Sequence, residues 1–276
     1  GSANESNNET TITSGTTAST SGGLYQSGAV YIYKRTGTIW AQEAYIKASN
    51  TGARDLFGSS ISLSGDGAVL AVGAPREDSN AVGINGDQTN NAASDSGAVY
   101  VFVRSGTTWS QEAYIKASNT DATDFFGSTV ALSSDGKSLA AAALRERSTS
   151  TGINGDESDN SGSATGAIYI FVSGSGTWSQ EAYVKASTAF TFYKFGISLA
   201  LSSNGNTLAA GAFDSVVEAG LDSGAAIIFK RIGTTWSQEA IVKASNSEAD
   251  DQFGTAMAIS GDGNTSGSRL AAIQLI

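Results

Sequence analysis

The chain has 276 residues and a formal net charge of −10, because 26 acidic residues outnumber 16 lysines and arginines. An acidic chain repels the phosphates of nucleic acids and of anionic membranes, so we expect neither as a partner. Cysteine and histidine are both absent. This excludes disulfides and thiolate metal sites, and it removes the side chain most used for proton transfer near neutral pH.

The first 23 residues are polar and low in complexity, and alone they are typical of a disordered segment. No apolar run in the chain approaches the roughly 20 residues that span a bilayer, so we expect no membrane insertion.

A repeat dominates the rest of the chain. "WAQEAYIKASN", "WSQEAYIKASN", "WSQEAYVKAST" and "WSQEAIVKASN" begin at Trp40, Trp109, Trp178 and Trp236. Apolar runs such as "SGAVYVF" precede them at matching offsets. Phe-Gly pairs follow them, each with a run such as "LAVGA" shortly after. Self-similarity at a fixed period indicates one supersecondary unit that packs against its own copies.

Each unit is predicted to contain four strands, as residues 57–117 illustrate. "SSISLS" alternates apolar and polar residues, and the "SGDG" turn follows it. "VLAVGA" is a short apolar run typical of a buried strand, and Pro75 ends it. "GAVYVFVR" is rich in β-branched and aromatic residues, and "WSQEAYIKA" follows a short turn. No stretch has helical periodicity. The Glu-Lys pairs of the "QEAYIKA" repeats are expected to be cross-strand ion pairs or solvated charges.

Four-stranded units repeated about an axis form a β-propeller. We therefore predict one all-β domain over residues 1–276 with four blades. The predicted blades are residues 57–117, 126–186, 195–244, and a split blade of 28–48 with 253–276, with residues 1–27 as its polar loop. The split blade would close the ring by joining N- and C-terminal strands. A ring shared between copies, or part of a longer array, fits the same repeats.

The segment "FGSSISLSGDGAVLAVGAP" (57–75) and its degenerate copies from Phe126 and Phe195 resemble the FG-GAP repeat, the blade unit of integrin α-chain propellers and of many bacterial surface and secreted proteins. The resemblance implies a propeller that binds proteins or glycans outside the cell or on its surface, often with calcium. A fold alone does not fix a function.

The calcium loops of that family have a D-x-D-x-D-G-type pattern between the first two strands, and this chain has only short turns there. A longer turn contains Asp262, Asn264 and Ser266 at alternate positions, a weak calcium pattern with one carboxylate. The loops between the second and third strands also offer closely spaced oxygens, from Asn85, Asp87, Asn90, Asn154, Asp156 and Asp159. The alternative is that these side chains hold turns.

One inter-blade loop differs from its copies. "STAFTFYKFG" (187–196) has Tyr193 where the equivalent loops have Asp55, Asp124 and Asp251. Aromatic side chains stack on sugars and anchor protein interfaces, so we predict a ligand site made of Phe190, Phe192, Tyr193 and Lys194. The alternative is that the aromatic residues fill a gap, since the neighbouring loop after Phe213 is short.

The sequence thus favours a non-catalytic extracellular propeller that binds a protein or a glycan, with calcium as its one candidate cofactor. A structural module of a surface assembly, including a homo-oligomer, and a carboxylate-based glycan-active enzyme are the alternatives. The absence of histidine and of a nucleophile–base motif counts against the enzyme.

Overall fold

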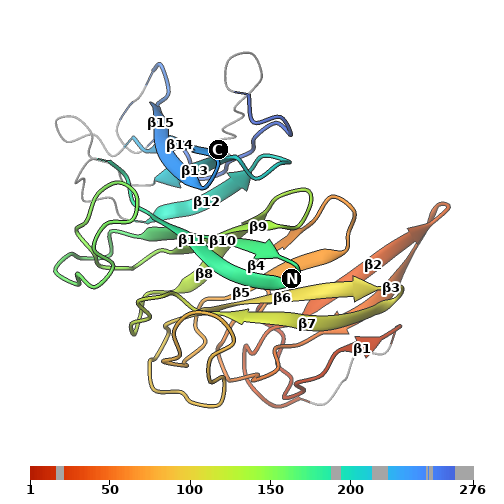
Figure 1. Ribbon diagram of the computed structural model, residues 1–276. Coiled ribbons are helices and arrows are strands. Elements are labelled where there is room, and N and C mark those ends of the chain that lie inside the picture. Colours follow the sequence, from red (N-terminus) through yellow and green to blue (C-terminus); the bar gives the residue numbers. More distant parts are fainter. Residues whose placement is uncertain (17–21, 188–193, 213–222, 247, 249–250, 265–276) are drawn as a thin grey trace.

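The computed structural model describes residues 1–16, 22–187, 194–212, 223–246, 248 and 251–264. These residues form strands, turns and loops without any helix, so none of them belongs to a helix that could cross a membrane. Four antiparallel sheets fan out one after another, with the first and the last at opposite ends of the fan (Figure 1). The predicted all-β, propeller-type architecture is confirmed.

The strands follow the predicted units closely. The first sheet contains β1 (Thr13–Ser14), β2 (Val30–Thr36) and β3 (Ile39–Ile46). The second contains β4 (Ser60–Leu63), β5 (Val69–Ala74), β6 (Ala98–Ser105) and β7 (Thr108–Ile115). The third contains β8 (Phe126–Leu132), β9 (Ser138–Ala143), β10 (Ala167–Gly174) and β11 (Thr177–Val184). The fourth contains β12 (Phe195–Leu201), β13 (Thr207–Ala212), β14 (Ala225–Ile232) and β15 (Thr235–Val242).

The Phe-Gly pair has a distinct role for each residue. Phe126 is buried and packs edge-on against Tyr169 and Phe171 of its own sheet, with ring centroids 5.4 and 6.2 Å apart. Gly127 has a φ of 81°, and a Cβ there would lie 2.3 Å from the carbonyl oxygen of Ala98 in the preceding sheet. The phenylalanine therefore anchors its own sheet, while the glycine allows two neighbouring sheets to approach closely.

Neighbouring sheets are joined along their first strands. The backbone N–H groups of Val130 and Leu132 on β8 donate to the hydroxyl oxygens of Ser60 and Ser62 on β4, at 3.0 and 2.9 Å. The turns after these strands also form a row, in which Gly65 N–H donates to Ser134 O at 2.8 Å and the pattern continues to the following turns. The polar side of the alternating strand thus faces another strand rather than water.

The first sheet differs from the other three. Its strand β2 pairs with β3, and its remaining strand, β1, comes from the N-terminal segment. Residues 251–264 lie against the fourth sheet, where Gly224 and Phe253 form a parallel bridge. Residues 265–276 lie outside the described chain. No described residue of the C-terminal segment pairs with β2, so closure of the split blade stays a prediction.

Candidate ligand-binding site

The connections between strands sort onto two faces of the fan. Residues 75–97 and 144–166 connect the second and third strands of their sheets, and they share one face with the inter-blade loops that lead to each Phe-Gly pair. We call this side the loop face. Both long loops run back along their own sheets, where Ile84 bridges Ile115 and Ile153 bridges Val184. Between the described strands, the opposite side has only short hairpin turns.

A buried charged network fixes the first long loop. Lys116 Nζ donates to Glu77 Oε2 and to Ser96 Oγ, each at 2.8 Å. Asn50, from the preceding inter-blade loop, donates to Glu77 Oε1 at 2.8 Å and accepts a hydrogen bond from the hydroxyl of Tyr100. The network therefore joins one strand, one long loop and the neighbouring blade.

The same network recurs twice. Lys185 Nζ lies 2.8 Å from Glu146 Oε2 and 2.7 Å from Thr165 Oγ1 in the third sheet. In the first sheet, Lys47 Nζ lies 3.0 Å from Glu5 Oε2, and Glu5 belongs to the N-terminal segment. That segment thus takes the path of a second-to-third-strand loop, as its place in the repeat predicts.

The sequence interpretation of these lysines was wrong. The Glu-Lys pairs of the "QEAYIKA" repeats were expected to be cross-strand ion pairs or solvated charges. Instead, the side chains of Lys47, Lys116 and Lys185 are almost fully buried, and each pairs with a glutamate from a loop. Burial lowers the pKa of each of these lysines against the opposing effect of its glutamate.

The aspartate that precedes Phe-Gly has a structural role. Asp55 Oδ2 accepts a hydrogen bond from Gly52 N–H at 2.7 Å, and Asp124 Oδ2 accepts one from Asp121 N–H at 3.2 Å. Both carboxyl groups are buried, and burial raises the pKa of Asp55 and of Asp124 to about 7. The other carboxyl oxygen of Asp124 is buried and has no hydrogen-bond partner.

The candidate calcium ligands of the first long loop hold that loop together. Asn85 Oδ1 accepts a hydrogen bond from Tyr114 N–H at 3.0 Å, so it pins the loop to β7. Asp87 Oδ1 accepts from both the N–H and the hydroxyl of Thr89, and Asn90 accepts from Asn80 N–H. These hydrogen bonds lower the pKa of Asp87.

The second long loop repeats this arrangement. Asn154 accepts from Tyr183 N–H at 2.9 Å, and Asp156 accepts from the N–H and the hydroxyl of Ser158. Asp159 accepts from Thr149 and Ser161, which lower its pKa strongly.

The acidic candidates do not gather around a common point. In the described ranges no three acidic side chains converge as a metal site would require. The C-terminal candidates behave like the loop acids, since Asp262 accepts from Ser260 Oγ and Asn264 N–H. Ser266 lies outside the described residues. Calcium binding therefore stays a prediction.

The aromatic candidates Phe190, Phe192 and Tyr193 also lie outside the described residues. Lys194 is described, and it is exposed with a φ of 68°. Leu56, Phe125 and Gln252 occupy the same position in the other inter-blade loops, with φ values of 57°, 56° and 56°. These left-handed residues form a row on the loop face, one beside each Phe-Gly pair.

A cluster around Phe125 was missed in the sequence. The guanidinium carbon of Arg145 lies 4.9 Å from the centroid of the Phe125 ring, and that of Arg76 lies 5.8 Å from it. Both arginines are exposed, and Phe125 is partly exposed. Lys194 occupies the repeat position of Phe125 in the next inter-blade loop. Its position relative to Arg145 is therefore the same as that of Phe125 relative to Arg76. The available signal was the arginine that recurs two residues after the end of the second strand.

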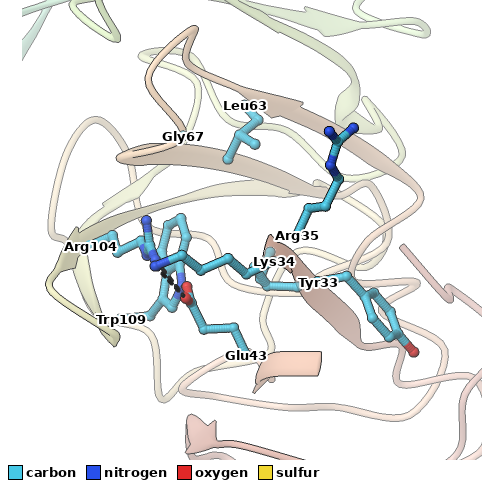
Figure 2. A pocket seen from close by; sticks show the side chains of 9 residues that line it. Tyr33, Lys34, Arg35, Glu43, Leu63, Gly67, Arg104 and Trp109 are labelled. Atoms are coloured by element: carbon cyan, nitrogen blue, oxygen red, sulfur yellow. Dashed lines mark hydrogen bonds and ion pairs between the residues drawn. The ribbon is translucent and has the colours of Figure 1, made fainter. Parts of the chain in front are cut away.

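A cavity of about 180 Å³ lies on the opposite face, between the first and second sheets. Figure 2 shows Glu43 beneath Lys34 and Arg104, with Arg35 pointing away from it. Glu43 lies 2.5 Å from Arg104 Nη2 and 3.9 Å from Lys34 Nζ. Its one carboxylate is thus already paired, and the cavity contains no pair of acids that could cleave a glycan.

Comparisons with known proteins agree with this architecture. The model of the FG-GAP repeat family matches residues 40–102, 109–171 and 236–265, more than half of the chain. No curated protein matches the chain.

A crystal structure titled "putative 6-phosphogluconolactonase" from Bacteroides uniformis ATCC 8492 superposes with a TM-score of 0.50 at 12% identity, over 87% of this chain and 57% of that one. A chain of the mitotic checkpoint complex, also 12% identical, has a TM-score of 0.33 over 86% and 65%. The chain thus spans less than two thirds of either structure, and the first likeness concerns the fold alone.

Proposed function

Because the chain belongs to the FG-GAP repeat family, a family of β-propeller binding modules, we propose that it is a non-catalytic extracellular adhesion protein that recognises a glycan through its loop face. The observation that carries this proposal is the cluster of exposed Arg76 and Arg145 around the partly exposed Phe125, between two internally hydrogen-bonded loops. The ligand that this chemistry favours is a short oligosaccharide with carboxylate groups.

The cluster offers two complementary interactions. An arginine guanidinium binds a carboxylate through two parallel hydrogen bonds. A phenylalanine beside it supplies a flat apolar surface on which a sugar ring can stack. Lys194 adds a further ammonium group on the same row. A short ligand suits the acidic protein, because a long polyanion would meet its net negative charge.

The surrounding loops support binding because their shape is fixed before a ligand arrives. The side chains of Asp87 and Asp159 are committed to hydrogen bonds inside their own loops. Asn119 links the second long loop to the inter-blade loop before Phe125 through the carbonyl of Glu157, at 2.7 Å. A surface that is already ordered loses less entropy when it binds.

A glycan array tests the proposal. We expect carboxylated oligosaccharides to bind better than neutral ones of the same length. The Arg145→Gln variant should lose about 10-fold or more in affinity, the usual size of one hydrogen bond to a charged group. Arg147→Gln is the matched control, because Arg147 is an exposed arginine two residues further along the same loop. Equal affinity of the two variants for carboxylated oligosaccharides would show that the cluster is not the binding site.

Calcium assistance is a separate part of the proposal. The same array, read with calcium and with a chelator, gives its effect on binding. Calcium should also raise the melting temperature if the exposed oxygens of the two long loops bind it. An unchanged melting temperature across a calcium titration excludes the ion and leaves the glycan site untouched. Binding only to a protein partner would instead favour adhesion between proteins.

A further inference from the structure

We propose that the two ends of the fan are complementary surfaces, and that the end formed by β2 and β3 docks against residues 223–246 and 251–264 of a second copy of this chain. The docking surface includes the cavity between the first and second sheets. It goes beyond the ligand site, which lies on the opposite face. Three independent observations support the assignment.

The first observation is a tryptophan–glutamate pair that recurs at every internal junction. Trp109 Nε1 donates to Glu43 of the preceding sheet at 3.3 Å. Trp178 donates to Glu112, and Trp236 to Glu181, both at 2.8 Å. Arg104 and Arg231 reinforce two of these glutamates at 2.5 and 2.9 Å.

The two ends of the fan hold the separated halves of the same pair. Trp40 occupies the tryptophan position of the first sheet, and its side chain is 64% exposed, whereas Trp109 is 3% exposed. Glu239 occupies the glutamate position of the last sheet, where Lys230 lies 3.9 Å away and no described tryptophan reaches it. Arg35 lies beside Trp40, at the position equivalent to that of Arg104. It is therefore placed to pair with Glu239 of a second copy.

The second observation concerns the phenylalanine of the Phe-Gly pair. Phe57, Phe126 and Phe195 are buried against aromatic rings of the third strand in their own sheets. Phe253 follows the last complete sheet and is only partly buried. The aromatic rings that match it in the repeat are Tyr31 and Tyr33 of β2, and Tyr33 is 56% exposed. The phenylalanine and its predicted partners are thus at opposite ends.

The third observation is the row of turns along the hairpin face. Gly136 packs so closely on the preceding turn that a Cβ there would lie 2.7 Å from Val69 Cγ2. In the same way, a Cβ at Gly205 would lie 2.6 Å from Ser138 Oγ, and one at Gly263 would lie 2.5 Å from Thr207 Oγ1. The equivalent Gly67 borders the cavity of Figure 2, and a Cβ there would meet only Leu63 of its own turn.

The surface beside Gly67 is apolar and open. Ile61 and Leu63 on β4 are 45% and 51% exposed, whereas Val130 and Leu132 at the same positions of β8 are nearly buried. Residues 257–259 of a second copy, which have the same place in the repeat as residues 61–63, would cover this surface. In that position Gly261 N–H would donate to the carbonyl of Gly65, as Gly65 N–H donates to Ser134 and Ser203 N–H to Gly261 inside one copy.

A second copy fits these surfaces better than the same copy. The two ends lie at opposite ends of the fan (Figure 1). Two copies joined head to tail at both ends would form a ring of roughly eight blades, at the upper end of the range for propellers. Such head-to-tail contacts give a ring when the rotation closes.

The test is the mass of the full chain in solution, measured by light scattering across a range of concentrations. We expect twice the 28.0 kDa of one chain, with no further growth as the concentration rises. The Arg35→Glu and Glu239→Arg variants should each be monomeric, because like charges would then face each other. Their equimolar mixture should recover the dimer, since opposite charges meet at both contacts.

Lys137→Glu is the control, because it reverses an exposed charge on the β8–β9 turn away from both ends. The melting temperature of each variant shows whether it folds, and recovery in the mixture excludes misfolding as the cause of monomers. A monomeric wild-type chain at every concentration would overturn the proposal. So would a dimer that survives both charge reversals. Mass that keeps growing with concentration would retain the contact and exclude the ring.

Discussion

The second sheet and the first sheet show how nearly identical sequences acquire different surroundings. "WSQEAYIKA" of the second sheet and "WAQEAYIKA" of the first differ at a single position. Trp109 is buried against Glu43 of the neighbouring sheet, whereas Trp40 is 64% exposed. The last sheet shows the same effect from the other side, since Ala240, Ile241 and Val242 are partly exposed where residues 113–115 are buried.

This difference teaches that the repeat encodes one half of each junction and the neighbouring blade supplies the other half. Nearest-neighbour contacts of this kind are typical of repeat proteins, whose stability is a sum of unit and interface terms. The comparison can therefore be tested by making the same substitution in a middle sheet and in an outer one.

The largest difference is expected at the buried lysine. Lys116→Met removes the partner of Glu77 and leaves a buried carboxylate without its counter-charge, which should lower the free energy of unfolding by about 3–5 kcal/mol. Lys243→Met changes the same position of the last sheet, where the side chain is partly exposed, and should stay within about 0.5 kcal/mol. Chemical denaturation of both variants measures the two values.

A double variant distinguishes loss of charge pairing from loss of packing. Glu77→Gln combined with Lys116→Met removes both charges, so much of the lost stability should return. Equal losses for Lys116→Met and Lys243→Met would contradict the comparison, because they would mean that the buried pair with Glu77 adds nothing to stability.

The next effect is a pH dependence of stability, which comes from the buried aspartates of two inter-blade loops. Burial raises the pKa of Asp55 and Asp124 to about 7, above the ordinary value of 3.8 for an unfolded chain. The stability that these two groups contribute is thus fully present below about pH 4 and is lost as the pH rises toward 7. At about 1.4 kcal/mol for each pKa unit, the loss is of the order of a few kcal/mol.

Thermal melts between pH 4 and pH 7 measure this loss. The Asp55→Asn and Asp124→Asn variants keep an acceptor for Gly52 and Asp121 N–H but cannot ionise, so the fall should shrink in each. Asp87 and Asp159 have lowered pKa values and therefore act below pH 4, outside this window. A wild-type protein equally stable at pH 4 and pH 7 would show that the two carboxyl groups ionise freely.

Much of the fold could be predicted from the sequence because strands depend on local pattern. The alternation in residues 60–63, the turn at Gly67 and the apolar run before Pro75 each placed an element correctly. The loop face was also predictable, because the longest connections lie between the second and third strands. The burial of particular polar residues could not be predicted from the local sequence. Lys116 and Glu77 are 39 residues apart, and Arg76 and Arg145 flank Phe125 only after two blades pack.

The smallest difference is expected between two glycines of the same turn. Gly67 and Gly136 both have a φ of 69°, so an alanine at either position meets the same backbone strain, about 1–2 kcal/mol. At Gly136 the new methyl group would also lie 2.7 Å from Val69, and this overpacking should add about 1–3 kcal/mol. Gly67→Ala should therefore lower the free energy of unfolding less than Gly136→Ala when both are measured in a monomeric Arg35→Glu background.

In the wild-type background the two losses of free energy should become similar, because a second copy would place its own turn against Gly67. If Gly67→Ala stays the milder change in both backgrounds, no turn packs against that glycine in solution. The difference between the outer and the middle sheets would then be a property of each single copy.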